Sequence, residues 1–247
     1  MIEKEISTYE KQSLLEQYLL FHYGDDKDLM PYSFGPQNAL HFPVKCVHEC
    51  LDAPSKGTAL DLGCAVGRSS FELSRFFDSV VGIDKSQAFI SAAKEIQDRG
   101  EISYSITEQG TNRSERTAKI PLGSNPKRVS FHCSDVMEIF TDSKQYDFIL
   151  AANLICRLED PMNFLNLLHE KVVKGGQLVI ASPYSWLEEF TPKHRWPQDC
   201  KNPLNFIQEA LGSKFSLQRT FDIPFLIREH ARKYQWGVSQ CSVWHRH

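Results

Sequence analysis

The stretch ALDLGCAVGR at residues 59–68 constrains the fold of this chain more than any other part of its sequence. Apolar residues lead to Asp61, and Gly63 and Gly67 follow at a spacing of four. This pattern is typical of a buried strand that turns sharply into a helix. A second apolar run at residues 80–83 ends in Asp84. A carboxylate about 20 residues beyond a glycine turn commonly accepts hydrogen bonds from a ribose diol. These segments predict a nucleotide-binding α/β unit.

The rest of the chain continues this alternation of strands and helices. Apolar runs predict strands at residues 58–62, 79–84, 128–133, 146–152, 177–182, 215–219 and 236–244. Helical periodicity and capping residues predict helices at 8–23, 42–51, 68–77, 86–100 and 161–173. Strands separated by helices predict a parallel sheet with helices on both faces. The first two helices precede the first strand, and we expect them to form an N-terminal cap.

We interpret residues 1–247 as one domain with three parts. Residues 1–55 form the cap helices and an aromatic loop, 56–182 the cofactor-binding core, and 183–247 a substrate loop and C-terminal strands. The polar segment 101–127 is expected to be a surface excursion, compatible with a hairpin and without a chemical role. The aromatic and charged segment 183–203 leaves the carboxyl end of a strand, where open α/β sheets bind ligands. We therefore expect it to face a substrate.

Composition excludes several classes of function. The net charge is −3, and the basic residues are scattered among acidic ones, so the concentrated positive face that nucleic-acid binding needs is missing. No apolar run approaches the 18 residues or so of a membrane span, and the charged N-terminus does not resemble a signal peptide. The seven cysteines lack metal-ligand spacing and are expected to be reduced thiols, which indicates a cytoplasmic protein. We predict no metal site, no membrane contact and no nucleic-acid partner.

The glycine turn departs from the dinucleotide fingerprint GxGxxG because its middle glycine is missing. The segment DLGCAVG at residues 61–67 instead resembles motif I of class I S-adenosylmethionine-dependent methyltransferases. This resemblance implies an α/β, Rossmann-like sheet of seven strands. It also implies S-adenosylmethionine as cofactor and S-adenosylhomocysteine as product. A nucleotide-binding oxidoreductase and a non-catalytic nucleotide-binding domain are the alternative interpretations.

The resemblance also implies which residues surround the cofactor. Asp84 would accept the ribose hydroxyls and Asp135 the adenine amino group, with a simple helix cap as the alternative for Asp135. Asn153 would lie under the sulfonium. Arg68 is compatible either with the cofactor carboxylate or with a helix surface. The whole predicted set is Asp61, Gly63, Cys64, Ala65, Gly67, Arg68, Asp84, Lys85, Ala88, Asp135, Val136 and Asn153.

Residues outside the sheet predict the acceptor. Aromatic side chains mixed with charges of both signs suit a small zwitterion with a planar ring. The predicted substrate-binding residues are Tyr32, Phe34, Asn153, Arg157, Tyr184, Arg228, Lys233, Tyr234 and Trp236. The residues predicted to orient the reacting ring are Tyr184, Glu188, Glu189 and His230. A structural hydrogen-bonding role is the alternative for His230.

Longer segments narrow the resemblance. They are YLLFHYG at 18–24, AANLICRL at 151–158, SPYSWLEEFTP at 182–192 and PFLIREHARKYQW at 224–236. They resemble the 4-mercaptohistidine (5-thiohistidine) N1-methyltransferase of ovothiol biosynthesis. This implies methyl transfer to an imidazole ring nitrogen, the last step of ovothiol A formation. Histidine's amine and other small thiol-imidazoles are the alternative acceptors.

In that family the unit is commonly the C-terminal domain behind an iron-dependent sulfoxide synthase. A separate or fused synthase is therefore an expected partner. No such module precedes the segment here, as expected for either a stand-alone enzyme or an excised domain.

Overall fold

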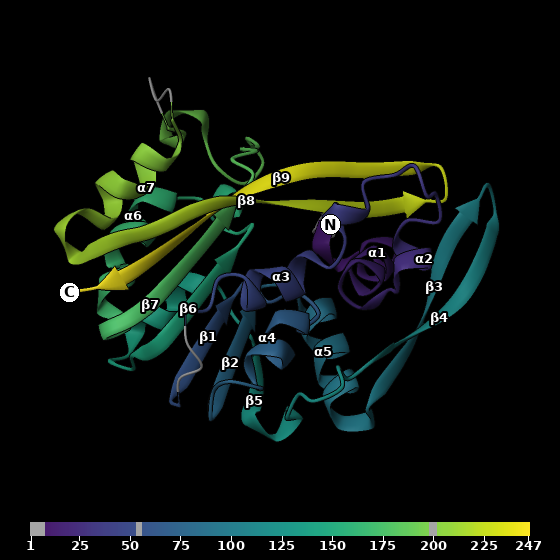
Figure 1. Cartoon of the computed structure of the whole chain (residues 1–247), viewed down its shortest axis with the longest axis horizontal. Coiled ribbons are helices and arrows are strands. Elements are labelled where there is room, and N and C mark those ends of the chain that lie inside the picture. Colours follow the sequence, from purple (N-terminus) through teal and green to yellow (C-terminus); the bar gives the residue numbers. More distant parts are fainter. Residues whose placement is uncertain (1–7, 53–55, 198–201) are drawn as a thin grey trace, which may run out of the picture.

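The computed structural model describes residues 8–52, 56–197 and 202–247 (Figure 1). Its central feature is a seven-stranded sheet in the order β5-β2-β1-β6-β7-β9-β8. The first five strands in this order are parallel, whereas β9 runs antiparallel to both of its neighbours. The predicted Rossmann-like sheet with helices on both faces is confirmed.

The strands are β1 (Thr58–Leu62), β2 (Ser79–Asp84), β3 (Glu101–Gln109), β4 (Asn112–Lys119), β5 (Val129–Cys133), β6 (Tyr146–Ala152), β7 (Val172–Ser182), β8 (Phe215–His230) and β9 (Lys233–Arg246). The α-helices are α1 (Gln12–Tyr23), α2 (Asp26–Leu29), α3 (Phe42–His48), α4 (Arg68–Leu73), α5 (Gln87–Arg99), α6 (Pro161–Leu167) and α7 (Leu204–Leu211). Short 3-10 helices are η1 (Thr8–Glu10), η2 (Gln37–Ala39), η3 (Pro126–Arg128), η4 (Val136–Thr141), η5 (Ile155–Arg157), η6 (Leu168–Glu170), η7 (Lys193–Arg195) and η8 (Gly212–Lys214).

The sheet separates two hydrophobic cores. Successive residues of a strand point to opposite faces, so Phe148 of β6 joins the core formed with α1, α3, α4 and α5, whereas Ile149 joins the core under α6 and α7. Because both faces are covered, the central strands are mainly apolar, which explains why their limits were predictable. The predicted strands 58–62, 79–84 and 146–152 match β1, β2 and β6.

The N-terminal segment lies over the carboxyl edge of the sheet rather than beside it. Glu10 accepts hydrogen bonds from the amides of Gln87 (2.9 Å) and Ala88 (3.2 Å) at the start of α5. The hydroxyl of Ser86 donates to the carbonyl of Tyr9 (3.1 Å) and also caps α5 by accepting from the amide of Phe89. The predicted cap helices, with η1 and α1 replacing the single helix 8–23, are thus fastened to the helix that follows β2.

Three predictions of secondary structure need correction. The predicted C-terminal strands 215–219 and 236–244 are parts of one long hairpin, β8–β9, which reaches past the sheet and over α1 (Figure 1). The predicted helix 161–173 ends earlier, because Val172 already pairs with Tyr146 in the sheet. The helix α7 was not predicted, although Leu204–Leu211 is amphipathic. The excursion 101–127 does contain a hairpin, β3–β4.

In the part of the chain that the structure describes, no helix is long and apolar enough to span a membrane.

Candidate functional site

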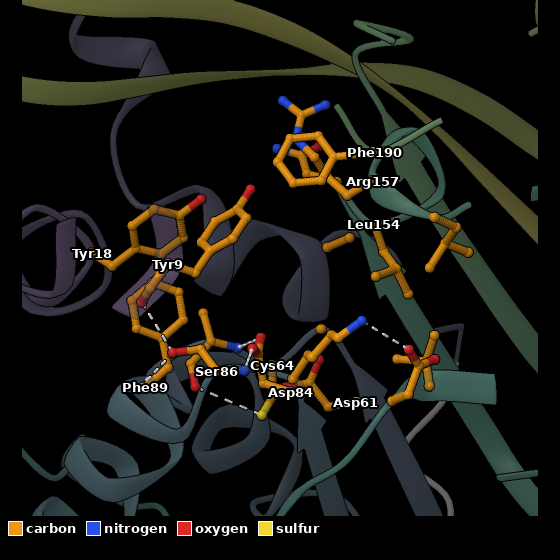
Figure 2. Close-up of a pocket in the computed structure, with 18 of the residues that line it drawn as sticks. Tyr9, Tyr18, Asp61, Cys64, Asp84, Ser86, Phe89, Leu154, Arg157 and Phe190 are labelled. Carbon is orange, nitrogen blue, oxygen red and sulfur yellow. Dashed lines mark hydrogen bonds and ion pairs between the residues drawn. The ribbon is translucent and has the colours of Figure 1, made fainter. Parts of the chain in front are cut away.

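A cavity of about 1100 Å³ lies at the carboxyl edge of the sheet, beneath the N-terminal cap. Its floor comes from the ends of β1, β2 and β6, and its sides come from η1, α1, η4 and the segment after β7. Figure 2 shows Asp61, Cys64 and Asp84 at the floor, with Tyr9, Tyr18 and Phe89 on one wall and Leu154, Arg157 and Phe190 on the other. One cavity therefore joins the predicted cofactor edge to the segment predicted to face a substrate.

The glycine turn after β1 is held by β2. The amides of Gly63 and Cys64 donate to the carbonyl of Ile83 (2.8 and 3.0 Å). The next residue, Ala65, has a φ of 47°, which is strained for a residue with a Cβ. Its amide donates to the carboxylate of Asp84 (2.9 Å), so a strand-end carboxylate fixes the shape of the turn that lines the cavity.

Asp84 has a second fixed contact, because its other carboxylate oxygen accepts from the amide of Ser86 (2.8 Å). Burial raises the pKa of the Asp84 carboxyl, and the hydrogen bonds from Ser86 and Ala65 oppose that rise. Each oxygen keeps acceptor capacity toward the cavity, as a ribose diol requires.

Asp61 is a more deeply buried carboxylate, only 2% exposed, and it lines the same cavity. Burial raises its pKa to about 7, although the Ser70 hydroxyl donates to it at 2.6 Å and the Asp84 charge adds to the rise. The floor of the cavity therefore contains two carboxylates, Asp61 and Asp84, and the folded protein ionises Asp61 only near neutral pH. A cation in the cavity would favour the ionised form.

At the next strand end, Asp135 takes the helix-cap role, one of the two roles that the sequence left open, and also lines the cavity. Its carboxylate accepts from the amide of Met137 (2.9 Å), as a cap of η4, and also pairs with Lys85 (3.3 Å). Asp135 and Lys85 line the cavity together with Val136.

The end of the cavity away from the floor is aromatic and cationic. The Arg157 guanidinium lies 5.3 Å from the centroid of Phe190 and donates to the carbonyl of Ser185 (2.7 Å). Burial raises the pKa of Tyr9, and nearby Arg157 opposes that rise. Tyr9 and Tyr18 pack edge to face, with ring centroids 6.3 Å apart. This end of the cavity offers flat rings and a fixed positive charge.

Carboxylates complete this end of the cavity. Glu188 and Glu189 both line it, and Glu188 pairs with Lys193 (3.4 Å). Asn153, at the end of β6, has a φ of 53°, and its side-chain oxygen accepts from the hydroxyl of Ser239 on β9 (2.6 Å). The amide side chain is thereby held between the floor and the end of the cavity that Arg157 and Phe190 line.

Three residues of the predicted cofactor set do not line the cavity. Gly67 is buried against Phe131, where an added Cβ would meet the ring at 2.6 Å, so it shapes the turn. Arg68 faces away, because its Nε pairs with Glu72 (3.0 Å) and its Nη1 donates to the carbonyl of His22 (3.3 Å). Ala88 lies behind Glu10, which occupies its amide.

Most of the predicted substrate residues lie elsewhere. Arg228 is 3% exposed and is held by the carbonyl of Asp28 and the carboxylate of Glu108, because β8 continues beyond the sheet and packs against α2 and β3. The hydroxyl of Tyr184 donates to Gln240 (2.9 Å), and His230 accepts from the amide of Arg232 (3.2 Å). The residues of this predicted group that do not line the cavity are Tyr32, Phe34, Tyr184, Arg228, His230, Lys233, Tyr234 and Trp236.

The contribution of the N-terminal cap to the cavity was not predicted from the sequence. Tyr9, Glu10, Tyr18 and His22 all line the cavity. Tyr18 and His22 stand one helical turn apart on α1, a spacing that also fits core packing. Their polar atoms within an otherwise apolar helix face were the available signal.

No cluster of His, Cys, Asp and Glu able to hold a metal occurs among residues 8–52, 56–197 and 202–247. In those ranges the cysteines are free thiols, and Cys200 lies outside the described residues.

Comparison with known proteins now defines the class. Residues 38–218 match a family described as a methyltransferase domain. Because the match spans more than half of the chain, the chain belongs to this methyltransferase family. It is an S-adenosylmethionine-dependent methyltransferase with a Rossmann-like class I fold. A search of curated proteins found no match.

Solved structures share the fold at low sequence identity. The N-methyltransferase NodS from Bradyrhizobium japonicum WM9, in complex with S-adenosyl-l-homocysteine, is 13% identical with a TM-score of 0.52, over 94% of this chain and 98% of that chain. Magnesium protoporphyrin IX methyltransferase (ChlM) from Synechocystis PCC 6803, with bound SAM, is 17% identical with a TM-score of 0.52, over 96% and 98%. The [4+2]-cyclase SpnF is 16% identical with a TM-score of 0.55, over 87% and 73%. This fold carries several chemistries, so the acceptor must be argued from the cavity.

Proposed function

We propose that this enzyme transfers a methyl group from S-adenosylmethionine to an imidazole ring nitrogen of 4-mercaptohistidine. The observation that carries the proposal is the acceptor end of the cavity, where Arg157, Glu189 and aromatic rings surround one space. This combination suits a small zwitterion with a planar ring. The longer sequence segments that resemble the ovothiol methyltransferase family support the same acceptor.

The floor of the cavity fits the cofactor. Asp84 stands where a ribose diol needs acceptors, and Lys85, Asp135 and Val136 surround the space beyond it. The Ala65 amide is already bound to Asp84, so the turn is preorganised before the cofactor arrives. We propose that Asp61 faces the cationic half of the cofactor and Asn153 the region of its sulfonium.

Arg157 is the proposed partner of the acceptor carboxylate. Phe190 lies beside the guanidinium, Nη1 donates to the carbonyls of Ser185 and Cys156, and Tyr9 is a further hydrogen-bonding neighbour. Donors on the other guanidinium nitrogens are the ones proposed to bind a planar carboxylate. Glu188 and Glu189 are the proposed partners of the acceptor ammonium, and Glu188 shares its charge with Lys193. Opposite charges on two sides of one space would fix the orientation of an amino acid.

The transfer is a single displacement, and bound S-adenosylmethionine supplies an activated methyl group on a sulfonium. The lone pair of the imidazole nitrogen forms the new N–C bond while the C–S bond breaks and its electron pair stays on sulfur. The other ring nitrogen then loses its proton to Glu189 or water. The protein mainly aligns nitrogen with the methyl group and excludes water.

Selectivity for nitrogen over sulfur needs geometry, because a thiolate is the stronger nucleophile. Tyr9, Tyr18 and Phe190 bound the acceptor end with rigid rings. A ring held between them has few orientations, and the one that points its nitrogen at the methyl group points the sulfur elsewhere.

The test is mass spectrometry of reactions that contain S-adenosylmethionine and either 4-mercaptohistidine, histidine or no acceptor. We expect a ring-methylated product with 4-mercaptohistidine alone. S-methylation, or methylation of histidine instead, would overturn the acceptor assignment while leaving the methyltransferase class intact.

A matched pair of variants tests the cavity. Arg157→Gln should raise the KM for the acceptor about 10-fold or more with little change in the KM for the cofactor, because a charge-assisted contact is lost. Lys233→Gln removes an exposed cation that lies outside the cavity and pairs with Glu229 (2.7 Å), so it should leave both constants within about twofold. Equal effects of the two substitutions on the KM for the acceptor would show that Arg157 does not bind it.

A further inference from the structure

His22 of α1 is a buried polar residue that neither the fold nor the proposed acceptor contacts explain. It is 8% exposed, and it lines the cavity. Its Nδ1 is enclosed and has no hydrogen-bond partner. Burial, and then the charge of Arg68, lower the pKa of the imidazole to about 3, so the ring is neutral at physiological pH. A buried polar atom without a partner is costly and calls for an explanation.

His22 lies beside the glycine turn, away from the end of the cavity that Lys85 and Asp135 line. The hydroxyl of its neighbour Tyr23 donates to the carbonyl of Val66 within the turn (2.7 Å). Arg68, which begins α4 directly after the turn, donates to the carbonyl of His22 (3.3 Å). With the ribose at Asp84 and the adenine beyond it, the amino-acid end of the cofactor points to this corner.

Arg68 brings positive charge to this corner. Its Nε pairs with Glu72 (3.0 Å), and it acts on His22 as a positive neighbour. Because Arg68 does not line the cavity, it supplies potential without a direct contact.

We propose that the imidazole of His22 donates a hydrogen bond to the α-carboxylate of the cofactor. A neutral imidazole carries one N–H donor. Because Nδ1 is enclosed, the nitrogen proposed to donate is Nε2, on a ring that lines the cavity. His22 thus takes a role that the sequence had left open for Arg68. Tyr18 stacks on the imidazole, with centroids 5.9 Å apart, and keeps the ring in place before the cofactor arrives.

The experiment measures dissociation constants by calorimetry for three ligands. S-adenosylhomocysteine carries the carboxylate and the ammonium. S-adenosyl-3-thiopropylamine retains the ammonium and lacks the carboxylate, and 5′-methylthioadenosine lacks both groups. The variants are His22→Phe, which keeps the aromatic stack, and His22→Asn, which keeps a side-chain N–H donor.

We expect His22→Phe to weaken S-adenosylhomocysteine about 10- to 100-fold, as for a hydrogen bond to a charged group, and to change the other two ligands less than about twofold. His22→Asn should recover part of the loss. If His22→Phe weakens S-adenosylhomocysteine and S-adenosyl-3-thiopropylamine but not 5′-methylthioadenosine, His22 contacts the ammonium and the carboxylate assignment is wrong. An equal loss for all three ligands would make His22 a packing residue. If His22→Phe fails to fold, His22→Leu, which also lacks an N–H donor, replaces it in the same ligand comparison, and an unchanged ratio of the three affinities would refute the proposal.

Discussion

Replacing Asp61 with Asn should stabilise the ligand-free protein at neutral and alkaline pH. Asp61 is 2% exposed, and burial raises its pKa from an ordinary 3.8 to about 7. Between these values the folded state binds more protons than the unfolded state, so the free energy of unfolding falls as the pH rises. The two pKa values lie roughly three pH units apart, and each unit corresponds to about 1.4 kcal/mol. The ionised carboxylate therefore costs up to about 4 kcal/mol above pH 7.

The assay is urea unfolding of both proteins from pH 4 to pH 8. Asn has nearly the same shape as Asp and does not ionise. The stability difference should be small near pH 4, grow through the window between the two pKa values, and reach its plateau above pH 7. Parallel stability curves would refute the assigned cause.

Ser70→Ala provides the control, and cofactor binding provides the link to function. The Ser70 hydroxyl stabilises the carboxylate, so its removal should raise the pKa of Asp61 further and increase the cost at pH 8. Because the cofactor is cationic, its binding at pH 6 should release a proton from Asp61. Calorimetry in buffers of different ionisation enthalpy would detect that proton, and the Asp61→Asn variant should not release it. The variant is expected to be more stable and to bind S-adenosylmethionine more weakly.

Two further predictions concern the turn and its helix. Gly67→Ala should destabilise the protein by about 2–5 kcal/mol in urea unfolding, because a Cβ at its φ of 85° meets Phe131 at 2.6 Å and adds overpacking to left-handed strain. Gly100→Ala, with a φ of 86° and nothing within 4 Å, should cost only about 1–2 kcal/mol, and equal losses would contradict the packing argument. Burial opposes ionisation of Glu72, but the hydrogen bond from His48 and the neighbouring guanidinium groups prevail and lower its pKa below 4.5. The stability that Glu72 contributes is therefore present above pH 4.5 and is lost as the pH falls through its folded pKa. In Glu72→Gln, the free energy of unfolding should therefore depend less on pH in this acid range. An unchanged pH dependence would show that Glu72 is not its source.

The sheet core and the glycine turn were predictable because their signals are local. β1 and β2 are buried on both faces, and the apolar run of each leads to a carboxylate, Asp61 near the end of β1 and Asp84 at the end of β2. The far half of the β8–β9 hairpin was not predictable in this way. There the two strands pair only with each other, and partly exposed residues interrupt the apolar pattern. The length of such a hairpin depends on its contacts with α1, α2 and β3 rather than on a sequence period.

The residues predicted to bind the methyl acceptor show the same contrast between local and non-local signals. Glu188 and Glu189 were placed at the cavity because they follow the carboxyl end of a sheet strand, a position that topology alone associates with ligands. Arg228 looked similar in sequence, yet its partners Asp28 and Glu108 come from segments with no local relation to it. Tyr18 was predicted only as part of the helix 8–23, since periodicity does not distinguish a core face from a cavity wall.

The contact between the N-terminal cap and the β8–β9 hairpin bears on when, during synthesis, the protein can bind its cofactor. Arg228 holds the carbonyl of Asp28 across 200 positions of the sequence, and Ile227 lines the cavity with Phe42. During synthesis, the sheet strands β1, β2 and β6 are made long before the hairpin, and domains generally fold as units once their residues are available. Until the hairpin is made, the cap would lack this contact and the cavity would lack one wall residue, Ile227. Tight cofactor binding is therefore expected only after β9 has been synthesised.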